Sequence, residues 1–397
     1  MRETKFRKTV TWTSFCFMIL VIFAHAVNME LFLGSEWKRS PAGIAESLLG
    51  NQLSQVAVPG FFFLSGILFF RNYDLRETRR KWRSRAVSLL IPYLLWNFLY
   101  YLGYLIGTHL PGLSTVVGRE AVPLSVIDFL QGVFLYKYNY VFWYLFQLIL
   151  LTLISPLLYL LASNGISFCL TEVFLLVIIF LRKNWTPLNA DACFYYFTAA
   201  GIALAIRPRN WRKKAERARE RERELARERQ RRIEEDYFYH SDESPISRPV
   251  SLKQEQYGGE RKRRRERLSV PFLQAFAVAG ILAYLLYLLA QKTANDLPLV
   301  MSRLLGVGSF WFLISALPLP EPREFMHRTF LTSALHFAPV RLINKTAALL
   351  FSGNAIVALI LYLIMPALMM LLTTLVAELG RRLFPEFLWF LTGGREG

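Results

Sequence analysis

The chain has 397 residues, of which 54% are hydrophobic, yet it carries a formal net charge of +18. Its mean hydropathy is +0.31. This combination excludes an ordinary soluble domain and indicates a membrane protein, with apolar residues gathered into spans and basic residues into loops. The three cysteines (Cys16, Cys169 and Cys193) all lie in apolar segments without the spacing of metal ligands, so no metal site is expected.

Apolar runs along the chain predict an all-α, polytopic membrane protein of about ten transmembrane helices. The first run follows the basic tail MRETKFRK; it is too long for a signal peptide and lacks a small-residue cleavage site. The ten runs cover residues 10–33, 51–70, 86–107, 141–162, 166–182, 191–206, 270–290, 298–317, 327–343 and 353–379. An even number of spans puts both termini on one side, and the basic residues in the intervening loops predict that this side is cytoplasmic.

The runs divide the chain into three regions. Residues 1–206 hold the first six spans and the expected active site, and residues 269–397 hold the last four spans and a cytoplasmic tail. Residues 207–268 are a charged, partly disordered cytoplasmic insertion, in which glutamates recur every four residues from Glu216, as in a solvated single helix. Beside a membrane, this basic segment favours contact with anionic lipid headgroups over nucleic-acid binding.

Residues 120–136 are apolar at roughly helical spacing but carry Glu120, Asp128 and Gln131. They are expected to form a short interfacial or re-entrant helix on the outer side. The alternative is an additional span, which would invert every later segment. The distribution of basic residues argues against that alternative.

The stretch from Val58 to Asn97 reads as a membrane hairpin around a basic loop. Pro59 removes a backbone donor within an apolar run, Pro92 does the same one span later, and the small pair Ser65-Gly66 allows another helix to approach closely. The loop carries seven cations between its two spans. They either signal topology only or form a phosphate-sized positive site at the mouth of the bundle, where a phosphorylated cytosolic donor docks.

Two of the five histidines lie within predicted spans, where an ionisable side chain is costly and therefore a functional candidate. His25 lies in ILVIFAHAVNMELF, with Asn28 three residues later on the same helical face. His336 lies in TFLTSALHFAPV. The alternative is that each imidazole only forms a hydrogen bond between helices.

Five segments stand out together along the chain. They are LVIFAHAVNM with His25, VPGFFFLSGILFF, RSRAVSLLIPYLLWN, NYVFWYLFQLILLTLISPLLY, and FLTSALHFAPVRLINK with a later FLTGGR. In this order, over almost the whole chain, they resemble the acyltransferase-3 family of integral-membrane acyltransferases. Ser14 stands where much of that family has an arginine, and Ile67 where an aromatic residue is usual, so the part played by that arginine does not carry over.

The resemblance implies transfer of an acyl group, usually acetyl, from cytosolic acyl-CoA to a hydroxyl of a cell-envelope glycan or lipid-linked sugar. It implies that His25 is the catalytic histidine, acting as general base or, alternatively, as a transient acyl carrier. Asn28 is then expected to orient the imidazole. Lys81, Arg83 and Arg85 are expected to hold the phosphates of the donor, which is a co-substrate rather than a bound cofactor.

The remaining site residues are expected to line the substrate tunnel: Ser65, Trp143, Tyr144, Gln147 and His336. The expected location is the inner (plasma) membrane, with acyl-CoA, the glycan acceptor and membrane lipids as partners and no nucleic acid. The competing hypothesis is a non-enzymatic exporter or scaffold for envelope glycan.

Overall fold

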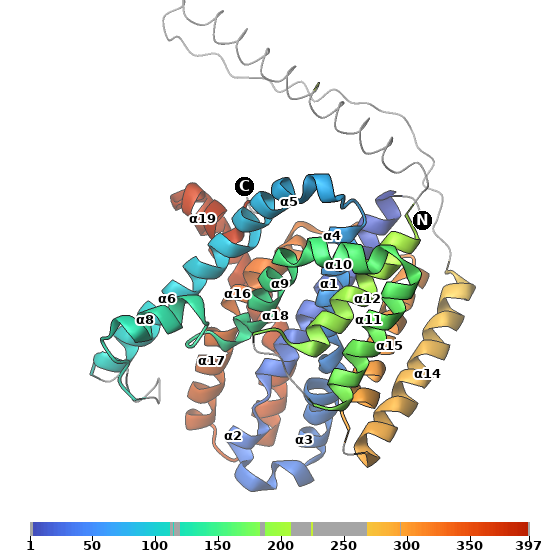
Figure 1. Ribbon diagram of the computed structural model, residues 1–397. Coiled ribbons are helices and arrows are strands. Elements are labelled where there is room, and N and C mark those ends of the chain that lie inside the picture. The colour runs from blue at the N-terminus through green and yellow to red at the C-terminus, as the bar shows by residue number, and fades with distance from the viewer. Residues whose placement is uncertain are drawn as a thin grey trace, which may run out of the picture. The chain divides into compact units, whose positions relative to one another are not determined.

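The computed structural model describes residues 3–111, 114, 120–182, 187–207, 224, 268–293 and 295–395. In these residues the regular structure is helical and includes no β-strand (Figure 1). Met1–Leu204 and Leu268–Gly397 form one compact unit, and Ala205–Arg267 form a second. The predicted charged helix that begins at Glu216, with nearly all of the insertion, lies outside the described residues.

Six of the described helical segments are long and apolar enough to cross a membrane, which makes the chain a multi-pass membrane protein. They cover Glu3–Arg39, Pro41–Phe70, Leu75–His109, Val270–Lys292, Leu297–Ala316 and Ala355–Leu383. Tyr140–Leu153 and Ser155–Ser163, bent by 65°, form a seventh candidate if they are counted as one span.

The predicted count of ten spans is not confirmed. Helices α11 (Gly165–Phe180) and α12 (Ala190–Ala205) have 16 residues each, and the run 327–343 is divided between α16 (Thr329–Leu335) and α17 (Phe337–Leu350). Helix α8 (Val126–Phe134) has nine residues. At 1.5 Å per residue, α8 is far too short to span a bilayer, in agreement with the predicted surface helix.

Helix α1 (Glu3–Ala26) is the central element of the larger unit. It contacts α4 (Ala57–Phe70), α15 (Leu297–Ala316), α17 and α18 (Ala355–Leu383). Its apolar side chains are buried on more than one side: Phe17, Met18 and Ile22 are each 0% exposed. By contrast, α14 (Val270–Lys292) packs along α15 at the edge of the unit and has no buried residue, so its face is free to contact lipid (Figure 1).

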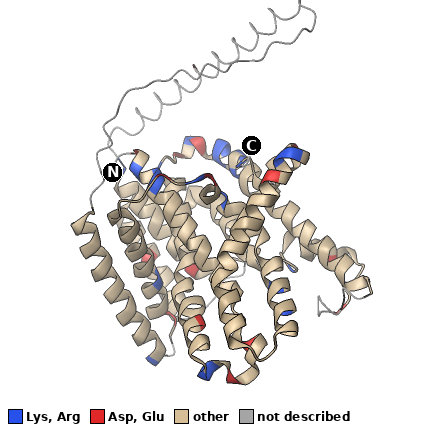
Figure 2. Cartoon of the chain, turned by 180° about the vertical axis from the view of Figure 1, so that it is seen from behind, with Lys and Arg blue, Asp and Glu red and all other residues tan. Residues whose placement is uncertain are grey.

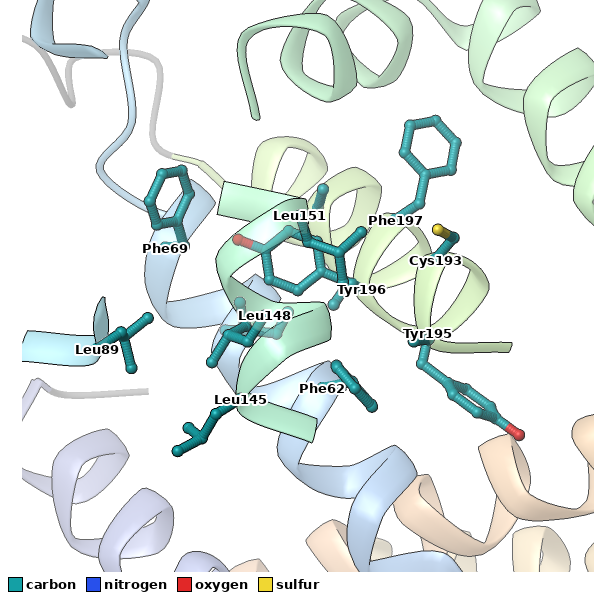
Figure 3. Close-up of a cluster of buried hydrophobic side chains, with 14 of the residues drawn as sticks. Phe62, Phe69, Leu89, Leu145, Leu148, Leu151, Cys193, Tyr195, Tyr196 and Phe197 are labelled. Carbon is teal, nitrogen blue, oxygen red and sulfur yellow. The ribbon is translucent and has the colours of Figure 1, made fainter. Parts of the chain in front are cut away.

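The largest buried cluster joins α4, α9 (Trp143–Leu153) and α12, with Phe62, Leu148 and Tyr196 among its members (Figure 3). A Cβ atom on Gly66 would lie 2.7 Å from the carbonyl oxygen of Tyr196 and 2.8 Å from the Cβ of Ala199. Only glycine fits at this contact, so the predicted role of the Ser65-Gly66 pair in close helix packing is confirmed.

The two prolines of the hairpin lie in the first turns of their helices, directly after irregular helical turns. A 3₁₀ turn at Leu53–Val56 precedes α4 with Pro59, and a π-helical turn at Ala86–Leu90 precedes α6 (Ile91–His109) with Pro92. Proline supplies no N–H to the carbonyl four residues earlier. The changes of helical winding occur where those hydrogen bonds are missing.

The segments predicted to face the cytoplasm meet at one end of the unit. Lys8 lies 3.6 Å from Glu321, Arg71 pairs with Glu3, and Arg381 lies 3.0 Å from Glu324. The hydrogen bond from Arg381, together with Arg328, holds the pKa of Glu324 below its ordinary value. Figure 2 shows Lys and Arg gathered at this end, beside both termini. That this end faces the cytoplasm stays a prediction.

The motif FLTGGR closes the chain onto the start of α6. Helix α19 (Pro385–Thr392) is followed by Gly393 at φ 63° and Gly394 at φ 75°, both in the left-handed region. A Cβ on Gly393 would lie 2.7 Å from the Cα of Ser88 and 2.8 Å from its carbonyl oxygen. Trp96 anchors the same segment by donating from Nε1 to the carbonyl of Leu391 at 3.0 Å.

We expect Gly393→Ala to lower the apparent Tm of the purified protein, because it adds about 1–2 kcal/mol of backbone strain and a steric overlap with Ser88. Gly308→Ala is the matched control, since its added Cβ meets nothing within 4 Å and alanine is the better helix former. Thermal unfolding in detergent compares the variants. Equal Tm values for Gly393→Ala and wild type contradict the close-packed terminus.

Candidate active site

His25 lies on the last turn of α1, directly before a break in the helix. Helix α1 ends at Ala26, and the next helix, α2 (Met29–Leu33), begins three residues later. Asn28 has φ −141° and ψ −12°, which is not helical, and its carbonyl accepts hydrogen bonds from the first turn of α2. The site is therefore built where the backbone unwinds.

Two buried side chains from distant segments satisfy the unwound backbone. The carboxylate of Glu46, which is 0% exposed, accepts hydrogen bonds from the N–H of Asn28 at 2.6 Å and of Met29 at 3.1 Å. Asn344 of α17 donates from Nδ2 to the carbonyl of Ala26 at 3.0 Å. Irregular backbone at membrane depth is tolerated only when protein groups pair with it in this way.

Asn28 does not make the predicted hydrogen bond to His25. Its amide donates to Asn344 Oδ1 at 3.3 Å and to the carbonyl of Ala358 at 3.2 Å. The prediction assumed that both residues lie on one helical face, but α1 ends before Asn28, which turns toward α17 and α18. No hydrogen bond from a described residue reaches the His25 ring, which leaves both of its nitrogens available.

A cavity of about 300 Å³ lies against His25. Trp143 lines it together with apolar residues of α4 such as Pro59 and Phe62. The polar and charged lining residues beside His25 are Ser54, Gln55, Asn189, Asp191, Tyr195 and Arg303. An apolar wall with a few convergent polar groups is the usual form of a small-molecule site.

Asp191 and Arg303 give this cavity charges of both signs. Arg303 donates to Gln55 Oε1 at 3.3 Å, and its Nε has no partner among the described residues. Asp191 makes no hydrogen bond or ion pair with a described residue, although the charge of Arg303 acts on it. The sequence analysis missed both residues. The sequence feature that could have identified them is an acidic and a basic residue within the predicted spans 191–206 and 298–317, where a charged side chain is costly.

His336 and His25 are brought together, although 310 positions of sequence separate them. Their ring centroids are 5.2 Å apart with the planes tilted by 47°. His336 is 1% exposed and does not line the cavity, whereas His25 does. Tyr140 and Phe337 pack against the other edges of the His25 ring, at centroid distances of 6.0 and 5.8 Å.

A second group of predicted residues leads from the basic end toward this cavity. The hydroxyls of Ser65 and Tyr144 lie 3.2 Å apart, and the Tyr144 ring packs 4.6 Å from that of Phe62. The charges of Arg85 and Arg395 both act on Tyr144 and on each other. Arg85 makes no ion pair or hydrogen bond with any described residue, so this cationic pair is available to an anion.

The three predicted phosphate-binding cations do not form one cluster. Lys81 and Arg85 share a face of the basic helix α5 (Thr78–Arg85), with their charges 5.4 and 5.6 Å from the Phe69 ring. Arg83 points elsewhere, into a separate pocket of about 460 Å³ that it lines with Arg80, Trp389 and the two glycines of FLTGGR. Residues four apart share a helical face and residues two apart do not, which explains the division.

Gln147 lies outside the cavity. Its Nε2 donates to the carbonyl of Pro187 at 2.8 Å, and its Oε1 accepts from the N–H of Asn189 at 2.9 Å. Both halves of the amide thus hold the segment before α12, which places Asn189 at the cavity, and Asp191 follows in the first turn of α12. Gln147 therefore contacts the cavity lining through Asn189.

The family model described as an acyltransferase domain matches residues 12–394. The chain belongs to the acyltransferase-3 family. No curated protein and no solved structure matches it. The protein is thus a membrane acyltransferase, which argues against the competing hypothesis of an exporter or scaffold. Within the described residues, no group of three or more His, Cys, Asp or Glu is placed to hold a metal ion.

In this acyltransferase, we expect Glu46→Ala to lower the apparent Tm markedly, because it leaves two buried backbone N–H groups unpaired at about 1–3 kcal/mol each. Thermal unfolding in detergent measures the change. Glu36→Ala is the control, since the Glu36 side chain is 68% exposed and forms a surface ion pair with Arg39. If the two variants unfold alike, Glu46 does not stabilise the helix break.

Proposed function

We propose that the protein transfers an acyl group, acetyl above all, from cytosolic acyl-CoA to a hydroxyl of a cell-envelope glycan or lipid-linked sugar, in the inner (plasma) membrane. The observation that carries this proposal is the position of His25. In an acyltransferase-3 chain, its imidazole lines a cavity with charged and polar residues, and no described residue forms a hydrogen bond with it.

His25 is proposed as the general base. An unpaired imidazole beside a cavity can take the proton of an acceptor hydroxyl while the oxygen attacks the thioester carbonyl. The same imidazole could instead carry the acyl group transiently, and a trapped acyl-histidine would distinguish that route. In either case Asn28 has a structural role, because the hydrogen bonds of its backbone and side chain stabilise the helix break directly after His25.

The cavity lining supports a polyhydroxylated acceptor. Asp191, Asn189 and Gln55 offer acceptors or donors for hydroxyl groups, and Arg303 offers a guanidinium whose Nε has no partner in the described part of the chain. Trp143 supplies an aromatic surface at the same wall. The cavity volume of about 300 Å³ lies at the lower end of the range for small-molecule sites.

The donor is proposed to enter at the basic end. Arg85 and Arg395 form a cationic pair, without a carboxylate partner among the described residues, next to Tyr144 and Ser65. This pair suits a pyrophosphate or phosphate group of acyl-CoA, which Arg binds in a bidentate manner. The acyl chain would then pass Tyr144 and Phe62 to reach the cavity at His25. Lys81 adds charge beside Arg85.

The deciding experiment is His25→Ala in the full-length protein. We expect loss of acetyl-CoA hydrolysis by the purified protein, together with loss of O-acetylated glycan by mass spectrometry of envelopes from complemented deletion cells. His109→Ala, at the exposed end of α6, is the matched control and should retain wild-type activity. Wild-type activity in a normally expressed His25→Ala protein would contradict the assignment of His25 as the catalytic base.

Arg85→Lys tests the donor site. Lysine keeps the charge but loses the planar fork, and a hydrogen bond between charged groups contributes about 1.5–3 kcal/mol, so we expect the KM for acetyl-CoA to rise about tenfold. Arg79→Lys, on an exposed position of the same helix, should leave KM unchanged. Arg83→Lys reports separately on the neighbouring pocket. If the KM for acetyl-CoA is unchanged in both Arg83→Lys and Arg85→Lys, these arginines do not bind the donor and serve only to set the membrane topology.

A further inference from the structure

The protonation state of His336 follows from its hydrogen bonds. Its Nδ1 lies 2.9 Å from the carbonyl oxygen of Ser333 and 3.2 Å from that of Thr332. Carbonyl oxygens only accept, so Nδ1 carries the proton, and a neutral imidazole then presents Nε2 as an acceptor. The backbone of α16 thus selects one tautomer of His336.

That acceptor is buried and has no partner. Nε2 of His336 makes no hydrogen bond with any described residue, and the whole side chain is 1% exposed. A buried polar atom left unpaired in this way costs free energy and calls for an explanation. Among the described rings, that of His25 is the one packed against His336, at 5.2 Å between centroids.

His25 is free to supply the missing donor. No hydrogen bond from a described residue holds its ring, and the two rings are tilted by 47° rather than aligned. The centroid separation of 5.2 Å leaves room for a rotation of the His25 side chain to bring one of its nitrogens to hydrogen-bonding distance of Nε2.

We propose that His336 is a positioning residue, whose Nε2 accepts a hydrogen bond from the protonated nitrogen of His25. This bond fixes the tautomer in which the other His25 nitrogen faces the acceptor as a base. The inference rests on the proposed function. In the transfer step the hydroxyl oxygen bonds to the thioester carbon, the carbon–sulfur bond breaks, and the proton passes through His25 to the coenzyme A thiolate. His336 accepts a hydrogen bond from His25 throughout and keeps its own proton.

The first test is spectroscopic and does not require activity. The chain has five histidines, so imidazole ¹⁵N spectra of histidine-labelled full-length protein in detergent can be assigned by substitution. We expect His25 to show one protonated and one unprotonated nitrogen in wild type, and averaged signals in His336→Phe. His336→Gln places an amide near the Nε2 position and should restore distinct signals. Identical His25 spectra in wild type and His336→Phe overturn the inference.

The second test is kinetic, with acetyl-CoA as the probe. We expect His336→Phe to lower kcat for acetyl-CoA hydrolysis about 10- to 100-fold, equivalent to about 1.4–2.7 kcal/mol in the barrier, with KM changed less than about twofold. His336→Gln should recover kcat to within about fivefold of wild type. Leu331→Ala, a buried change in α16 directly before His336, should lower stability without this selective loss of kcat.

The outcomes separate the two proposals. An inactive wild type, or an active His25→Ala protein, overturns the proposed function and leaves the spectra to decide the contact between the histidines. An active wild type with full kcat in His336→Phe overturns the positioning role while the function of His25 stands. A loss of kcat in His336→Phe that Leu331→Ala matches also overturns the positioning role, because repacking then accounts for it.

Discussion

The break after α1 is the constraint on which the site depends. Ending a helix within a membrane protein exposes backbone N–H and C=O groups that neither lipid nor apolar side chains can satisfy. Here Glu46 and Asn344 supply the hydrogen bonds. Glu46 follows α1 closely in the sequence, whereas Asn344 lies near the other end of the chain. Because His25 lies one residue before the last residue of α1, its position depends on these contacts.

Helix α4 connects the two halves of the site. Phe62 lines the cavity beside His25, Ser65 lies 3.2 Å from Tyr144, and Phe69 packs under the cations of α5. These residues are spaced by three and four positions, so they follow one face of the helix. Gly66 places the neighbouring face directly on the backbone of α12. One helix therefore runs along the whole proposed route from donor entry to base, and its packing leaves little freedom to shift.

The C-terminal segment completes the proposed donor end. Gly393 lies against Ser88 in the π-helical turn before α6, and Arg395 brings a second guanidinium toward Arg85. A like-charged pair of this kind is unfavourable without an anion. The arrangement explains why a short motif at the end of the chain belongs to the same functional unit as the basic hairpin near its beginning.

Composition and local pattern were sufficient for the coarse features. The apolar runs indicated an all-α membrane protein, the small pair at Ser65-Gly66 indicated close helix packing, and the intramembrane histidines indicated His25 and His336 as candidates. These properties depend on the contacts of each segment with lipid or with the adjacent helix. Hydropathy and residue size predict such contacts directly from the sequence. The residues carrying the family resemblance pointed to the acyltransferase-3 family, which the match over 12–394 confirms.

Only the tertiary structure decided which polar groups meet. Asn28 turns away from His25, Glu46 and Asn344 hold the helix break, and Arg83 lines a pocket that Arg85 does not. All three findings follow from where helices end and how they cross. The contact between His25 and His336 joins residues more than 300 positions apart. Local periodicity carries no information about such contacts, because they arise from the packing of whole helices against one another.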